Sequence, residues 1–126
     1  MDGLIAFWTA RLDEIEQAAR AAGAGTPEGS WSQADPDTRP GRIEDGTGNV
    51  VTYDEGSPDD GQAPHIALND PASALADVAA DRALIELLGQ AAREDDYDVS
   101  RVMREVASIR AARFSSHPEW KQEWAP

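Results

Sequence analysis

The sequence predicts a mainly α fold: a compact bundle of three helices, with a small β-hairpin or irregular insertion and a short C-terminal helix. Three observations support this prediction. Apolar residues recur at helical spacing in residues 2–22, 71–92 and 98–114. Most of the glycines and prolines lie between the first two of these stretches, in residues 23–64, where they disfavour a long helix. A length of 126 residues is typical of one domain, so we expect a single domain over residues 1–126.

The first helix is predicted over residues 2–22. Its apolar residues follow one another at intervals of three or four, which keeps them on one face of a helix. This face consists of Leu4, Trp8, Leu12, Ile15, Ala19 and Ala22. Asp2 suits the N-cap, and Gly23 ends the helix. We therefore expect this helix to bury one long stripe in the core.

The insertion, residues 23–64, is predicted to form a small β-hairpin or an irregular acidic loop. Short strand-like pieces lie around Trp31, around Ile43 and at Val50–Tyr53. The turn-forming run Asp45–Asn49 joins the last two pieces and favours a hairpin. Because an isolated two-stranded hairpin is only marginally stable, it would have to lean on the helices.

The second helix of the bundle is predicted over residues 71–92. A helical turn at residues 65–68 precedes it. Asp70 and Pro71 mark its start, because aspartate suits the N-cap and proline the first helical position. Its expected buried stripe is Leu75, Val78, Ile85 and Leu88 or Ala92. Arg82 falls on the same stripe, so we expect it to reach the edge of the core or to pair with a carboxylate such as Glu16 or Glu86.

The third helix is predicted over residues 98–114, with Asp98 as its N-cap. Its expected inner face is Val99, Val102, Met103, Val106, Ile109 and Ala112. Acidic residues precede this helix and arginines end it, which suits the helix dipole. The short connection from the second helix predicts antiparallel packing of the two.

The tail, residues 115–126, is predicted to contain the short C-terminal helix. Pro118 suits its first position, which places Trp120 and Trp124 on one face, four residues apart. Large aromatic side chains either anchor a tail onto the core or contact a partner. These two tryptophans are therefore the candidate partner-binding residues.

The formal net charge of −13 constrains the partners of the protein. Such a charge repels nucleic-acid phosphates and anionic membrane surfaces, so we expect no direct binding to either. Acidic residues concentrate in the middle of the chain, which leaves mimicry of nucleic acid by residues 35–60 as a minor alternative. The sequence has no cysteine, no signal-peptide pattern and no apolar run that could span a membrane, so we expect a cytoplasmic protein.

The sequence carries no catalytic or metal-binding motif. It has neither a phosphate-binding loop nor a zinc-binding His-Glu-x-x-His helix, and Pro40 stands where a calcium loop starting at Asp35 requires glycine. We therefore predict no cofactor and no metal. Four polar residues would form a site if the fold brought them together: His65, Asp70, Arg82 and His117.

Three blocks of residues resemble a known family. The opening block contains Leu4, Phe7, Ala10, Arg11, Leu12, Asp13, Glu14, Glu16, Ala19 and Arg20. The central block contains His65, Ile66, Ala67, Asp70, Pro71, Ala72 and Leu75, and the closing block His117, Pro118, Glu119, Trp120, Glu123, Trp124 and Pro126. In order and spacing they are similar to a family of small proteins of unknown function in actinobacteria and their phages, with departures in residues 32–62 and near 93–104. The resemblance implies an intracellular setting and no particular activity.

Two classes of function follow from these observations. The first is a non-catalytic accessory or interaction protein that binds another protein, as a monomer or homodimer, in an actinobacterium or its phage. The alternative is a small ligand-binding or hydrolase-like protein that uses the four polar residues. The two differ in one observable, which is whether those four residues converge in one pocket.

Overall fold

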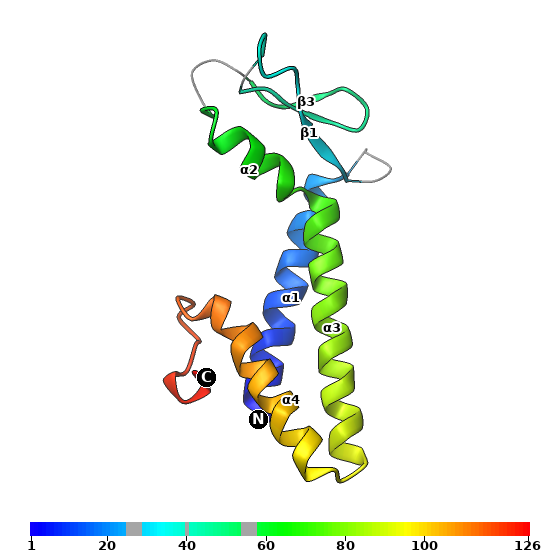
Figure 1. Cartoon of the computed structure of the whole chain (residues 1–126), viewed down its shortest axis with the longest axis vertical. Helices are drawn as coiled ribbons and strands as arrows, with labels where there is room; N and C mark the ends of the chain where they lie inside the picture. The colour runs from blue at the N-terminus through cyan, green and yellow to red at the C-terminus, as the bar shows by residue number, and fades with distance from the viewer. Residues whose placement is uncertain (25–28, 40, 54–57) are drawn as a thin grey trace. The chain divides into compact units, whose positions relative to one another are not determined.

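The computed structural model describes residues 1–24, 29–39, 41–53 and 58–126, and it confirms the mainly α fold (Figure 1). The helices are α1 (Asp2–Ala22), α2 (Gln62–Leu68), α3 (Pro71–Arg93) and α4 (Tyr97–Ala111). The strands are β1 (Trp31–Gln33), β2 (Ile43–Asp45) and β3 (Val50–Thr52). Two short 3-10 helices, η1 (Ala112–Phe114) and η2 (Gln122–Trp124), lie toward the C-terminus. The three long helices lie where the apolar spacing placed them.

The described residues divide into two compact units. Unit 1 consists of residues 1–14 and 78–126, and unit 2 of residues 15–77. The helices α1 and α3 each contribute residues to both units. The single-domain expectation stays a prediction, and the two units are described separately below.

Unit 1 is a bundle of the N-terminal part of α1, the C-terminal part of α3, and α4. Its buried apolar residues are Leu4, Phe7, Trp8, Leu12, Val78, Leu88, Ala91, Ala107 and Ala111. The predicted α1 stripe is thus confirmed for Leu4, Trp8 and Leu12. The connection from α3 to α4 turns through Asp95, which has a left-handed backbone (φ 56°), and α4 runs back along α3 as expected (Figure 1). Aspartate tolerates this conformation better than most residues.

The predicted inner face of α4 is wrong for Val99, Val102 and Ile109, whereas its other three residues, Met103, Val106 and Ala112, are half-buried. Its buried residues are Ala107 and Ala111, whereas Val99 and Val102 are each 47% exposed and Ile109 is 60% exposed. The small alanines let α4 approach its neighbours closely. On that side of the helix, Arg110 also reaches a buried carboxylate of α3. Helix α4 therefore turns its alanines inward and leaves most of its β-branched residues outside.

The predicted N-cap of α4 is also wrong. Helix α4 begins at Tyr97, and the Asp96 side chain accepts a hydrogen bond from the Val99 amide at 3.1 Å. Asp98, the expected cap, lies in the first helical turn. Both aspartates suit the positive end of the helix dipole, so composition alone did not separate them.

The tail does not form the α-helix expected after Pro118. Lys121 has an extended backbone (φ −105°, ψ 131°), which interrupts helical geometry between the two tryptophans. Only the 3-10 turn Gln122–Trp124 follows it. The chain bends at Lys121. Contacts with α1, and not the hydrogen bonds of a helix, hold the tail in position.

Unit 2 contains a three-stranded antiparallel sheet in the order β1-β2-β3. The predicted hairpin is confirmed as β2-β3, and β1 adds a third strand in which Trp31 pairs with Asp45. At the hairpin turn the Asp45 carboxylate accepts hydrogen bonds from the Thr47 hydroxyl (2.7 Å) and amide (2.8 Å) and the Asn49 amide (3.0 Å). These bonds, that of the Thr47 hydroxyl first, lower the pKa of Asp45. The ordered turn explains why the hairpin forms in place of an irregular loop.

Helix α2 covers this sheet. It packs against β1 and β2, and Ala63 of α2 and Ile43 of β2 are fully buried. The helical turn predicted at residues 65–68 is therefore the end of a longer helix, which stops at Asn69 as expected. Parts of the insertion, including Pro40 of the rejected calcium loop, lie outside the described residues.

No helix in the described part of the chain is both long and apolar enough to cross a membrane.

Candidate functional site

Asp81 is the buried polar centre of unit 1. Its side chain is fully inaccessible to solvent, and both carboxylate oxygens are occupied. Oδ1 accepts from Arg110 Nε at 2.8 Å and Nη2 at 2.6 Å, and Oδ2 accepts from Arg113 Nη2 at 2.7 Å and Trp8 Nε1 at 3.2 Å. These bonds join α1, α3, α4 and the 3-10 turn that follows α4. Because a buried carboxylate is costly unless paired, this cluster determines how the helices meet.

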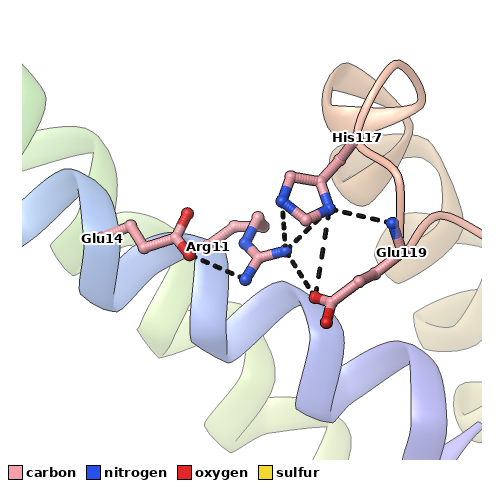
Figure 2. A network of polar contacts seen from close by, with 4 residues as sticks. All are labelled: Arg11, Glu14, His117 and Glu119. Carbon is pink, nitrogen blue, oxygen red and sulfur yellow. Dashed lines mark hydrogen bonds and ion pairs between the residues drawn. The ribbon is translucent and has the colours of Figure 1, made fainter.

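Arg11 is the centre of a second polar network, which fastens the tail to α1 (Figure 2). Only 7% of this residue is exposed. Its Nη2 donates to Glu14 at 2.8 Å and its Nη1 to Glu119 at 3.0 Å. Nη1 also lies 2.9 Å from Nδ1 and 2.8 Å from Nε2 of His117. The Glu119 amide also lies 3.1 Å from Nδ1 of His117, so the imidazole is held from both sides.

An aromatic cluster lies beside this network. The Phe7 ring contacts four rings of the C-terminal part, with centroid distances of 6.5 Å to Phe114, 5.6 Å to His117, 5.7 Å to Trp120 and 5.2 Å to Trp124. The Arg11 guanidinium lies 5.1 Å from the Phe7 centroid. The two candidate tryptophans therefore anchor the tail on α1, and a partner-binding role for their exposed edges stays a prediction.

The four polar residues that sequence reasoning selected have different neighbours. In unit 1, Arg82 donates to Asp13 at 2.7 Å, and His117 belongs to the Arg11 network. In unit 2, His65 is exposed on α2, and its carbonyl accepts the Asn69 side-chain amide at 2.8 Å. The described contacts place each residue in a different local setting. Arg82 pairs with a carboxylate as expected, although Asp13 was not among the partners suggested for it.

Asp70, the fourth of these residues, caps α3 as predicted. It accepts from the Ser73 amide at 2.8 Å and from the Trp31 amide, at the start of β1, at 2.9 Å. Burial raises the pKa of Asp70, but the hydrogen bonds from Ser73 and Trp31 together lower it below the ordinary value. Gly29 lies close by with φ +60°, and its carbonyl accepts from the Ala72 amide at 3.0 Å. Asp70 therefore joins the sheet to α3 and acts as a structural group.

Unit 1 carries an apolar stripe that is largely exposed, the α4 face, defined here as Val99, Val102, Val106 and Ile109. The four residues follow at intervals of three, four and three, so they lie on one side of α4. Val106 is half-buried and the other three are exposed. Single exposed apolar residues are common, but an aligned set on one helix indicates a contact surface.

A cavity of about 600 Å³ lies between α1, α3 and α4 in unit 1. Its apolar lining comes mainly from Met1, Ile5, Ala6, Ile85, Leu88 and Ala92. Arg104 lines both this cavity and a neighbouring cavity of about 430 Å³ beside the chain end at Pro126. No hydrogen bond or ion pair holds Arg104 within the ranges that the structure describes. Nor do those ranges contain a group of three His, Asp or Glu residues that could hold a metal ion.

Sequence reasoning missed Asp81, Arg11 and the exposure of the α4 face. A signal for Asp81 was present, because it continues the buried stripe of α3 at helical spacing between Val78 and Ile85. A lone carboxylate in such a stripe indicates a buried partner. Arg11 offered a weaker signal, since an arginine on α1 also fits an exposed helix surface.

The comparison with known families identifies the chain. It belongs to a family of unknown function, DUF6221, whose family model matches residues 1–126. No curated protein and no solved structure matches the chain.

Proposed function

We propose, for this member of a family whose description names no activity, that it is a non-catalytic accessory protein of an actinobacterium or its phage. It acts by binding another protein through the α4 face. The observation that carries this proposal is the exposure of Val99, Val102 and Ile109, which are 47%, 47% and 60% accessible on one side of α4. Their transfer out of water on binding supplies the driving force.

The polar clusters support a non-catalytic role. Both oxygens of Asp81 accept hydrogen bonds from Trp8, Arg110 and Arg113. His117 is held between Arg11 and the Glu119 amide. A general acid or base needs a free position from which to exchange a proton with a substrate. These groups are engaged in holding helices and tail together.

The test is site-specific photo-crosslinking in a lysate of an actinobacterial host. A photoreactive amino acid replaces Val102 on the α4 face, or Leu87 as a matched control, because Leu87 is 49% exposed on α3 of the same unit. We expect a defined crosslinked protein from position 102 and none from position 87. Equal crosslinking from both positions, or none from 102, would contradict the proposal. Trp120→Ala/Trp124→Ala in the same assay decides whether the tail adds to the contact.

A second candidate function, binding of a small amphipathic anion, is favoured by the cavity and Arg104. Arg104 is exposed, lines the apolar cavity and makes no ion pair in the described residues. A fatty-acid-like carboxylate would bury its chain between α1 and α3 and bring its charge to this guanidinium. We favour this cavity over the four polar residues because it combines an apolar lining with a cationic group.

Calorimetric titration with decanoate tests this candidate. We expect binding to the wild type and about tenfold weaker binding to Arg104→Gln, because a charge-assisted hydrogen bond is lost. Arg101→Gln is the matched control, since Arg101 lines only the neighbouring cavity and lies 3.7 Å from Glu105. Equal binding by both variants would show that Arg104 does not select the anion. The absence of binding to the wild type would remove the candidate.

A further inference from the structure

We propose that the protein bound at the α4 face is a second copy of this chain, with the two α4 helices antiparallel about a two-fold axis. This inference rests on the proposed function, because it requires the α4 face to be a binding surface. It goes further in naming the partner and the orientation. Three properties of α4 carry it.

The first property is that the α4 face is symmetric along the helix. Its intervals of three, four and three read the same from either end. An antiparallel copy therefore sets Val99 opposite Ile109 and Val102 opposite Val106, and the same contacts recur on the other side of the axis. Such self-complementarity is what a two-fold interface requires. The residues are β-branched, so they lose little side-chain freedom when they are buried.

The second property is the distribution of charge. Four acidic residues lie at the N-terminal end of α4, at positions 94, 95, 96 and 98, and two arginines lie at its C-terminal end, Arg110 and Arg113. In the same alignment Asp98 lies opposite Arg110, and the acidic turn that precedes α4 lies toward the end of the helix that Arg113 follows. A parallel pair would instead set acidic ends against each other. Antiparallel packing also brings opposite helix-dipole ends together.

The third property is that the positive charge of Arg110 and Arg113 is only partly neutralised. They share the single carboxylate of Asp81, which leaves one positive charge uncompensated within this cluster. Their side chains are still 39% and 33% exposed. They can therefore face an acidic end of a neighbouring helix without leaving Asp81. That end of α4 is a positive point on a strongly acidic molecule, and the acidic end of a second copy complements it.

The size of the surface predicts a reversible dimer. Helix α4 has 15 residues and is therefore about 22 Å long. One helix face of this length lies at or below the lower end of stable interface areas. We therefore expect monomer and dimer to exchange over an accessible concentration range.

Sedimentation equilibrium at rising protein concentration tests the partner. The wild type should pass from monomer to dimer, and Val102→Glu/Ile109→Glu should raise the dissociation constant by about 100-fold or more, because the interface would bury four carboxylates without partners. Leu87→Glu, on an exposed part of α3, should dimerise like the wild type. Circular dichroism checks that each variant is folded. A wild type that stays monomeric would overturn the inference, while crosslinking of another protein at position 102 would still support the proposed function.

Cysteine crosslinking tests the orientation, and it is unambiguous because the chain has no cysteine of its own. Chains carrying Val102→Cys are mixed with differently tagged chains carrying Val106→Cys and oxidised. Antiparallel packing predicts mixed disulfides between the two kinds of chain. Disulfides within each kind alone would indicate parallel packing and overturn the arrangement. A dimer that Val102→Glu/Ile109→Glu leaves intact would place the interface elsewhere and overturn the inference.

Discussion

Helices α1 and α4 carry apolar stripes of the same helical spacing, but α1 buries its stripe and α4 exposes most of its own. In α1 the large residues Leu4, Trp8 and Leu12 fill the core of unit 1. In α4 the residues turned inward are Ala107 and Ala111, and Arg110 beside them reaches Asp81. The difference shows that apolar spacing reveals a face, while ionic partners and small side chains decide which face is buried.

Removal of Asp81 is the strongest test of this comparison. Asp81→Ala leaves Arg110, Arg113 and the Trp8 indole without their shared acceptor, so we expect a loss of about 3 kcal/mol in the free energy of unfolding. Asp13→Ala breaks the exposed pair with Arg82 and should cost about 0.5 kcal/mol or less. Urea unfolding followed by circular dichroism measures both. Similar losses in the two variants would show that Asp81 does not determine the packing of α4.

Truncation within each stripe compares the two helices directly. Leu12→Ala opens a cavity in a fully buried site, and we expect it to cost about 3 kcal/mol. Val102→Ala on α4 should change stability by about 0.5 kcal/mol or less when the chain is dilute enough to be monomeric. The measurement is the same urea titration. A large loss for Val102→Ala in dilute solution would mean that its stripe is buried in the monomer.

The N-cap of α4 tests how this helix is rotated about its axis, with a smaller expected effect on stability. Asp96→Ala removes the acceptor of the Val99 amide and should cost about 1 kcal/mol. Asp98→Ala leaves that cap intact and should cost about 0.5 kcal/mol or less, through the helix dipole alone. Thermal unfolding of the two variants distinguishes the true cap from the expected one. The reverse order would restore Asp98 as the cap.

The smallest expected effect concerns the cap of α3 in unit 2. The hydrogen bonds to Asp70 lower its pKa below the ordinary value of 3.8 in the folded state. Its ionised form therefore stabilises the fold above that value, and this contribution is lost as the pH falls through the lower, folded-state pKa. Asp70→Asn should have a flatter decline in stability below about pH 4 than the wild type. Parallel acid titrations, monitored by Trp fluorescence, measure the difference, and identical slopes would contradict it.

Much of the backbone was predictable from local signals. The spacing of Leu4, Trp8 and Leu12 gave α1, the pair Asp70 and Pro71 gave the start of α3, and the turn at Asp45 gave the hairpin. Each of these signals acts through neighbours a few residues away. The sequence signal for the third strand, β1, was weaker because the only large apolar residue of this strand is Trp31.

The structure predictions failed where contacts between residues distant in the sequence determine the packing. The rotation of α4 depends on Arg110 meeting Asp81, which is 29 residues away, and the apolar pattern of α4 carries no trace of that pair. The position of the tail depends on Phe7, whose ring contacts the rings of residues more than a hundred positions later in the chain. The hydrogen bonds of Arg11 reach equally far. A sequence read alone shows such groups without showing which of them meet.

The attachment of the tail to α1 has a consequence for biosynthesis. Phe7 and Arg11 are translated more than a hundred residues before their partners His117, Glu119 and Trp124. Unit 2 is one continuous segment of chain and can assemble during translation, whereas unit 1 must wait for its second segment. Until then the apolar side of α1 is exposed to the cell. The apolar side of α1 therefore needs protection from aggregation from its own synthesis until these C-terminal partners have emerged.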